Sequence, residues 1–277
     1  MKIYDCFTFY NELDLLELRL ELLYDHVDKF IIVESEHTFQ NKPKPLYLSE
    51  NQERFEKYSD KILLIVTPGG KHQDPWMNER DQRDAIKLGL DDADPDDIAI
   101  ISDVDEFIRP EAIQAMRDST AQVFGLRVPY FNFKFNYMLV NNGETYCVWN
   151  VAARVGALPS PEDLRRQRWT LHQLPYGHND GRVMMLEHAG WHFTYLGDDD
   201  FIRTKIKSFA HSELNTDSTL AKINVSESIA QGRGFNLDDP RQFVTIDLDD
   251  YFPVQLQKYT QYVLPNTGNS ARAFLPR

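Results

Sequence analysis

The chain has 277 residues, 42% of them hydrophobic, which is enough to bury a substantial core. Its formal net charge of −13 argues against a nucleic-acid partner, because proteins that bind a polyphosphate backbone cluster Lys and Arg. Two cysteines are too few for a disulfide framework, and no stretch approaches the roughly 18 apolar residues of a membrane span. We therefore expect a cytoplasmic protein without a transmembrane segment, which leaves room for peripheral contact with a membrane.

The first part of the chain predicts alternating strands and helices. Residues 2–9 are apolar and aromatic and predict a strand, and the leucine-rich run that follows predicts a buried helix. Residues 30–33 predict a second strand, which ends at Glu34. This order opens a doubly wound α/β sheet, in which an acid after a strand can accept hydrogen bonds from a nucleoside. We assign Glu34 to that role, although the absence of Gly-x-Gly-x-x-Gly disfavours a dinucleotide fold.

A third strand is predicted at residues 61–66, and a helix with a polar face at residues 76–90. That face carries Arg83, whose planar fork of donors suits a phosphate group. An exposed arginine paired with a surface acid is the alternative interpretation of Arg83.

The stretch that leads to Pro110 carries the strongest chemical signal. The apolar run of residues 98–101 predicts a buried strand of a parallel sheet, and Asp103 and Asp105 follow at its carboxyl end. Ligands bind at that edge of open α/β sheets, and two carboxylates there can hold one divalent cation. The Asp-x-Asp pattern occurs five times in this acidic chain, but only this pair directly follows an uninterrupted apolar strand. The alternative is that the acids cap the helix after Pro110.

Aromatic, strand-like segments follow between residues 121 and 154, and their tyrosines and phenylalanines are mostly expected in the core. The basic cluster Arg165, Arg166 and Arg168 predicts a solvated face, with contact to an anionic acceptor as the alternative.

Residues 183–213 form the second informative stretch. His192 shares a compact polar and aromatic segment with the acids at positions 198–200, and imidazole is a common ligand of manganese-like ions. Capping explains three acids at a helix start equally well, and a lone histidine is usually structural. The chain is polar from residue 216 onward, so we predict one domain at 1–215 and a C-terminal extension at 216–277 packed on it.

Three separated blocks resemble family 17 glycosyltransferases and occur in that family's order. They are FIIVESEHTFQNKPKPL at residues 30–46, DDIAIISDVDEFIRPE at 96–111, and AGWHFTYLG followed by IRTKIKSFAH within 189–211. The resemblance implies a GT-A-like nucleotide-sugar-binding fold with a mostly parallel central sheet flanked by helices. It also implies a UDP-N-acetylglucosamine donor, a glycan or glycolipid acceptor, and Mn²⁺ or Mg²⁺ held through the Asp-x-Asp acids. Donor contacts are then expected from Asp103, Trp191 and Lys205.

The expected chemistry is an inverting transfer, which needs a carboxylate base to take the proton of the acceptor hydroxyl. Asp200 is the first choice, because it aligns with the acidic position that follows Gly-Trp-His in the family. Asp199, Glu187 and Glu106 are the alternatives.

Two other functions remain open from the sequence. A nucleotidyltransferase would share the sheet, the metal and the nucleotide but would release pyrophosphate instead of UDP. A non-catalytic, metal-dependent carbohydrate-binding protein would turn over no sugar nucleotide. A phosphatase-like aspartate nucleophile is disfavoured, because such an acid normally follows the first core strand and here the acids follow the fourth.

Overall fold

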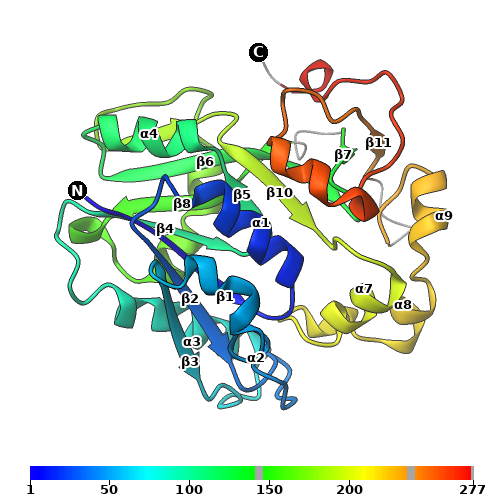
Figure 1. Cartoon of the computed structure of the whole chain (residues 1–277), viewed down its shortest axis with the longest axis horizontal. Helices are drawn as coiled ribbons and strands as arrows, with labels where there is room; N and C mark the ends of the chain where they lie inside the picture. Colours follow the sequence, from blue (N-terminus) through cyan, green and yellow to red (C-terminus); the bar gives the residue numbers. More distant parts are fainter. Residues whose placement is uncertain (141–145, 236–240, 276–277) are drawn as a thin grey trace.

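The computed structural model describes residues 1–140, 146–235 and 241–275, which form an α/β structure around one curled sheet (Figure 1). The described strands are β1 (Ile3–Phe9), β2 (Lys29–Ser35), β3 (Ile62–Thr67), β4 (Ile98–Asp103), β5 (Glu106–Ile108), β6 (Val123–Asn132), β7 (Tyr137–Leu139), β8 (Tyr146–Arg154), β9 (Val183–Leu186), β10 (Gly190–Thr194) and β11 (Phe243–Thr245). The described α-helices are α1 (Leu13–Leu23), α2 (Tyr47–Glu50), α3 (Pro75–Asp84), α4 (Pro110–Asp118), α5 (Pro161–Arg166), α6 (Arg168–His172), α7 (Asp199–Ile206), α8 (Asp217–Ala221) and α9 (Val225–Ala230).

The sheet is parallel in one half and mixed in the other. Strands β3, β2, β1 and β4 are neighbours in that order and all run parallel, as the alternation of strands and helices predicts. Beyond β4 the order continues with β8 and β6, each antiparallel to its predecessor. Consecutive strands can pair antiparallel without a helical crossover, which is how β6 and β7 pair. The α/β class is thus confirmed, with a mixed rather than a mostly parallel sheet, and the GT-A-like arrangement stays a prediction.

Alternation along the parallel strands separates two layers of core. In β1, Ile3 and Phe7 face the layer that holds the leucines of α1, whereas Tyr4 and Cys6 face the opposite layer. The period of two in a strand sends successive side chains to opposite faces, so both faces of β1 are covered. Figure 1 shows α1 lying across the sheet on one side. Cys6 is a buried free thiol, as its apolar surroundings predict.

Parallel pairing brings three strand ends to one edge of the sheet. Strands β1, β2 and β4 all end there, and the Asp103 to Asp105 segment directly follows β4. Strand β10 reaches the same edge from far along the chain, because it pairs parallel with β6 and antiparallel with β5. The register of the β5 pairing sets His192 opposite Glu106, which places His192 beside the acids of residues 103–106.

The C-terminal part of the chain contributes to the core. Strand β11 pairs antiparallel with β7, and Phe252, Leu256 and Tyr259 are buried in the same cluster as α1. Short 3-10 turns and buried aromatic side chains hold the described part of the chain from residue 252 onward. Figure 1 shows this segment in orange and red around β7 and β11. The division of the chain at residue 215 stays a prediction.

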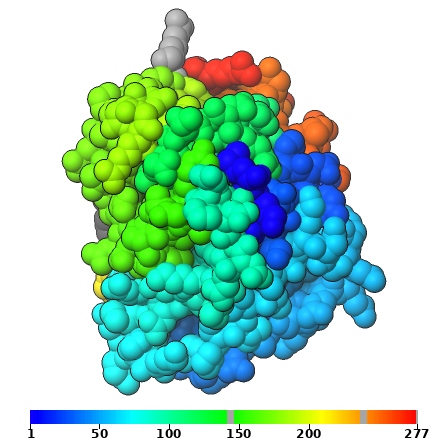
Figure 2. Space-filling model, turned by 90° about the vertical axis from the view of Figure 1, so that its left-hand side faces the viewer, coloured from blue at the N-terminus to red at the C-terminus, as the bar shows by residue number. Residues whose placement is uncertain are grey.

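The start of the chain lies on the face drawn in Figure 2, where the dark blue residues are visible at the surface. There Arg117 of α4 donates a hydrogen bond to the Met1 carbonyl. Within the described ranges, none of the helices has the length and apolar character needed to cross a membrane. The cytoplasmic location stays a prediction.

Candidate functional site

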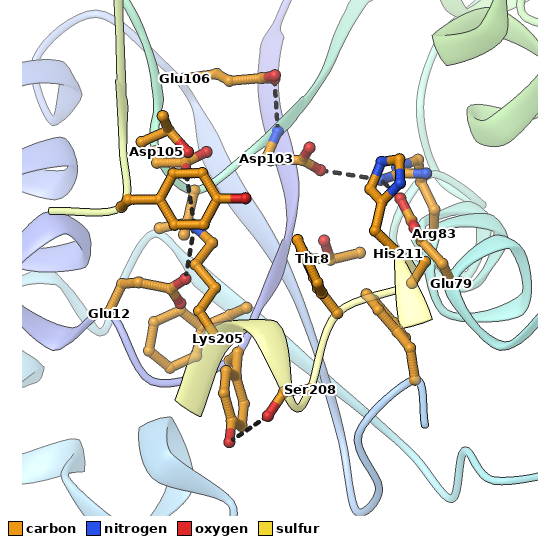
Figure 3. Close-up of a pocket in the computed structure, with 18 of the residues that line it drawn as sticks. Thr8, Glu12, Glu79, Arg83, Asp103, Asp105, Glu106, Lys205, Ser208 and His211 are labelled. Carbon is orange, nitrogen blue, oxygen red and sulfur yellow. Dashed lines mark hydrogen bonds and ion pairs between the residues drawn. The ribbon is translucent and has the colours of Figure 1, made fainter. Parts of the chain in front are cut away.

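A cavity of about 400 Å³ opens at the edge where β1, β2 and β4 end. Its walls also include residues of α3, α5, α7 and β10, so segments from the whole chain meet there. The carboxylates that line it are Glu12, Glu79, Asp103, Asp105 and Glu106, and the basic side chains are Lys44, Arg83, Arg165, Arg168, Lys205 and Arg241. Figure 3 shows several of these groups pointing toward one another across the cavity. Five of the predicted site residues, Arg83, Asp103, Asp105, His192 and Lys205, therefore share one cavity.

Asp103 is held by two guanidinium groups. Its Oδ1 lies 3.0 Å from Arg83 and its Oδ2 lies 2.9 Å from Arg165. Burial alone would raise the pKa of Asp103, but Arg165 and Arg83 outweigh it and keep the pKa well below its usual range. Arg83 is itself buried and also binds Glu79, so the interpretation of Arg83 as an exposed surface arginine is wrong.

Asp105 faces a different set of partners. Lys205 Nζ lies 2.8 Å from Asp105 Oδ2 and 3.5 Å from Glu12, and Figure 3 shows this ammonium between the two carboxylates. On the other side, His192 Nε2 lies 3.6 Å from Asp105 Oδ1. Burial would raise the pKa of Asp105, yet Lys205 and His192 hold it well below its usual range. Asp105 therefore stays a carboxylate throughout the physiological range.

The turn that carries Asp103 and Asp105 is held by Arg19, a residue that sequence patterns did not single out. Arg19 of α1 is fully buried, pairs with Asp5 at 2.6 Å, and donates to the carbonyls of Asp103 and Glu106 at 2.9 and 2.8 Å. It also donates to Ser102 Oγ. A guanidinium has five donors in a rigid fork, so one side chain can satisfy several acceptors. The available signal was a single charged residue in the middle of the leucine-rich face of α1.

The residues fit a divalent metal ion as a partial set of ligands. Asp105 Oδ1 and His192 Nε2 lie 3.6 Å apart and converge from β10 and the end of β4, whereas Asp103 is taken up by two arginines. Over the described ranges, no group of three or more His, Cys, Asp and Glu side chains is placed to hold a metal. Mg²⁺ commonly takes only one or two carboxylates, with water and substrate phosphates as its other ligands. A carboxylate and an imidazole beside a diphosphate would suit Mg²⁺ or Mn²⁺ in this way.

His192→Ala tests the metal assignment. We expect Mn²⁺ affinity to fall about tenfold or more, since losing a contact at a metal site usually costs at least that much. Electron paramagnetic resonance of free Mn²⁺ during a titration measures this directly. His192 packs against Trp149 with ring centres 4.6 Å apart, so some loss of stability is also expected. A lower melting temperature with unchanged Mn²⁺ affinity would show that His192 is structural.

Two predicted donor contacts, Glu34 and Trp191, lie outside the cavity lining. Glu34 is buried at the end of β2 and accepts hydrogen bonds from the backbone N–H groups of Leu48 and Ser49. Trp191 is buried in the core, with the guanidinium of Arg109 4.0 Å from its ring centre. Glu34 thus supports the turn at α2 and Trp191 supports β10. Their assignment to the donor stays a prediction that this geometry does not favour.

Asp200 does not line the cavity. Its side chain is 92% exposed and binds Arg203 one turn along α7. Asp198 provides the helix cap, because its Oδ1 accepts from the backbone N–H of Phe201. The capping interpretation therefore accounts for Asp198, and the role of Asp200 as the base stays a prediction.

The alternative bases are also placed by the structure. Asp199 accepts from the Val225 backbone, and Glu187 pairs with Arg127; neither lines the cavity. Glu106 does line it, but it is buried and bound by Arg165.

The family of the chain is established by comparison with known proteins. The family model described as glycosyltransferase family 17 matches residues 1–267. The chain belongs to glycosyltransferase family 17.

Named relatives within that family are the β-1,4-mannosyl-glycoprotein 4-β-N-acetylglucosaminyltransferases of Homo sapiens, Rattus norvegicus and Mus musculus. Each is 26% identical to this chain over 219 residues, which is 72% of this chain and 41% of the relative. The chain thus matches less than half the length of these relatives.

Two solved structures show weak overall similarity. One is a mannosyltransferase from Pyrobaculum calidifontis in complex with GDP-Man and Mn²⁺, with a TM-score of 0.39 and 13% identity over 74% of this chain and 60% of that one. The other is a 2-C-methyl-D-erythritol 4-phosphate cytidylyltransferase from Francisella tularensis, with a TM-score of 0.34 and 13% identity over 68% of this chain and 90% of that one.

Proposed function

We propose that this protein is a metal-dependent, inverting glycosyltransferase that moves N-acetylglucosamine from UDP-GlcNAc to a hydroxyl of a glycan or glycolipid. The observation that carries the proposal is the Asp105–His192 pair in a cavity rich in arginine and lysine, at the edge of the sheet where β4 ends. Family membership supports sugar transfer as the reaction, and the names of the relatives support N-acetylglucosamine as the sugar.

The chemistry of the donor agrees with these side chains. Breaking the bond between the sugar and the diphosphate leaves negative charge on the leaving group, and a metal ion held by Asp105 and His192 would stabilise that charge. Arg83 and Arg165 fix the Asp103 carboxylate at 3.0 and 2.9 Å. Asp103 is therefore an oriented acceptor, which suits a hydrogen bond from a donor hydroxyl.

The acceptor's proton must pass to a carboxylate within hydrogen-bond reach. Glu12 and Glu79 line the cavity, and they are the first variants to make as Gln. Glu12 lies 3.5 Å from Lys205 and Glu79 lies 2.7 Å from Arg83, so each carboxylate faces a neighbouring cation.

Asp200→Asn separates the predicted base from a surface acid. Because the Asp200 side chain is exposed and bound to Arg203, we expect the variant to keep transfer within about threefold of the wild type. General-base catalysis is worth roughly 10²-fold or more, so the two roles differ clearly in kcat. Initial transfer rates at saturating donor and acceptor decide the matter. A transfer rate about 10²-fold lower than that of the wild type would identify Asp200 as the base.

Product analysis tests the proposed reaction as a whole. Purified protein incubated with UDP-GlcNAc, Mn²⁺ and a glycan mixture should release UDP, and chelation should stop the release. Pyrophosphate as the product would identify a nucleotidyltransferase instead. Binding of sugar nucleotides or glycans without turnover of any of them would indicate a carbohydrate-binding protein.

A further inference from the structure

Arg168, the first residue of α6, is a basic side chain of the cavity that pairs with none of the acids the structure describes. Its Cζ lies 5.6 Å from the ring centre of Trp149 and 4.7 Å from that of Trp169, so two indoles hold it in place. In the part of the chain that the structure describes, it makes no hydrogen bond or ion pair, and its Nε is buried without a partner. Arg168 as a whole is half-buried, and partial removal of a charged group from water costs free energy unless the charge is paired.

Neighbouring basic side chains of the cavity already form ion pairs with its carboxylates. Four basic side chains pair with acids at 4 Å or less: Arg83 with Glu79 and Asp103, Arg165 with Asp103 and Glu106, Lys205 with Glu12 and Asp105, and Lys44 with Glu34. The charges of Arg165, Glu106 and Asp103 act on Arg168 electrostatically, but Arg168 forms no ion pair with any described acid. Arg168 is therefore available to pair with the anionic part of a ligand in the cavity.

Arg168 keeps its charge at neutral pH although its surroundings oppose it. Burial, together with the positive charge of Arg165, lowers the pKa of Arg168 to about 10. The guanidinium is thus protonated at pH 7 and gains more from a bound anion than a fully hydrated arginine would. A guanidinium also binds two oxygens of one phosphate at once.

The position of Arg168 relative to the metal pair indicates which anion it meets. Trp149 is a neighbour of both groups, because its ring centre lies 5.6 Å from Arg168 Cζ and 4.6 Å from the ring centre of His192. Arg168 is therefore one indole ring away from the Asp105–His192 pair. The anion expected beside that pair is the diphosphate of a nucleotide donor.

We propose that Arg168, a basic side chain of the cavity that pairs with none of the described acids, binds the diphosphate of the donor. This inference rests on the proposed function, because it takes the donor to be a nucleotide sugar. It assigns Trp149 and Trp169 as positioning residues that hold the guanidinium.

Calorimetric titration of four proteins with three probes tests the inference. The proteins are the wild type, Arg168→Gln, Arg168→Lys and Arg166→Gln, and the probes are UDP, inorganic pyrophosphate and uridine, each with and without Mn²⁺. Arg166 is the matched control, since it is an exposed arginine two positions away that does not line the cavity. Melting curves of all four proteins check that they are folded.

Arg168→Gln should lower the affinity for UDP and for pyrophosphate at least tenfold and leave the affinity for uridine unchanged. The affinities of Arg168→Lys should lie between those of Arg168→Gln and the wild type. Arg166→Gln should bind all three probes within twofold of the wild type. UDP affinity within twofold of the wild type in Arg168→Gln would overturn the inference. An equal loss of affinity for uridine would also overturn it. A wild type that binds pyrophosphate through Arg168 but no nucleoside diphosphate would refute the proposed donor and leave the anion site standing.

Discussion

Asp105→Asn is expected to lower the rate of sugar transfer from UDP-GlcNAc by about 10²- to 10³-fold. Of the acids in the cavity, Asp105 alone pairs with His192, so amidation removes the charged half of the proposed metal pair. The magnitude follows from the several kcal/mol of transition-state stabilisation that a bound metal supplies at a developing charge. Mn²⁺ affinity should fall in parallel. UDP release at several Mn²⁺ concentrations gives both quantities.

Asp92→Asn is the matched control for that experiment. Asp92 also belongs to an Asp-x-Asp pair, but it is exposed and lies outside the cavity lining, so its amidation should leave transfer unchanged. Asp103→Asn should cost less than Asp105→Asn, because Asp103 contacts two arginines rather than the metal pair. Full activity of Asp105→Asn at saturating Mn²⁺ would contradict the assignment.

The structure changes what Asp105→Asn should do to stability. An acid that follows the end of a strand is often exposed, and its loss then costs little stability. Asp105 is instead 5% exposed and bound by Lys205. Weakening a buried hydrogen bond to a charged group costs about 1–3 kcal/mol, so a lower melting temperature is expected. Glu12, 3.5 Å from Lys205, is left to neutralise the ammonium.

Sequence patterns predicted the parts of the fold that depend on local order. The strands β1 to β4 follow from short apolar runs that alternate with helical ones, and the position of Asp103 and Asp105 follows from the end of β4. The carboxyl ends of parallel strands meet at one edge, so Asp103 and Asp105 are expected to lie beside the loop after β1. The same reasoning could not place β10 or β11, because their partners lie far away in the chain.

Side-chain direction explains why Glu34, Trp191 and Asp200 lie outside the cavity. Each residue belongs to a segment close to the cavity, but its side chain has another environment. Glu34 binds the backbone of α2, Trp191 is buried in the core, and Asp200 is exposed to solvent. A strand exposes alternate residues on opposite faces, so one position decides whether a side chain reaches the cavity. His192 lines it, whereas its neighbour Trp191 does not.

Arg19→Met is expected to destabilise the protein by about 3–5 kcal/mol, the usual cost of leaving one partner of a buried ion pair uncompensated. Asp5 and Arg19 are both fully buried, and water cannot replace the lost guanidinium around Asp5. Chemical denaturation of Arg19→Met and of Arg54→Met measures the effect. Arg54 also pairs with acids, at the surface, so its loss should cost about 1 kcal/mol or less.

A second variant separates the charge from the turn that it supports. Asp5→Asn/Arg19→Met removes both charges and should recover part of the lost stability, because no charge is left buried without a partner. It cannot restore the donors to the carbonyls of Asp103 and Glu106. The turn that carries Asp105 should therefore stay less well ordered, and Mn²⁺ affinity should remain below that of the wild type at a temperature where the double variant is folded. Wild-type Mn²⁺ affinity in the double variant would show that Arg19 neutralises Asp5 without positioning the acids of the site.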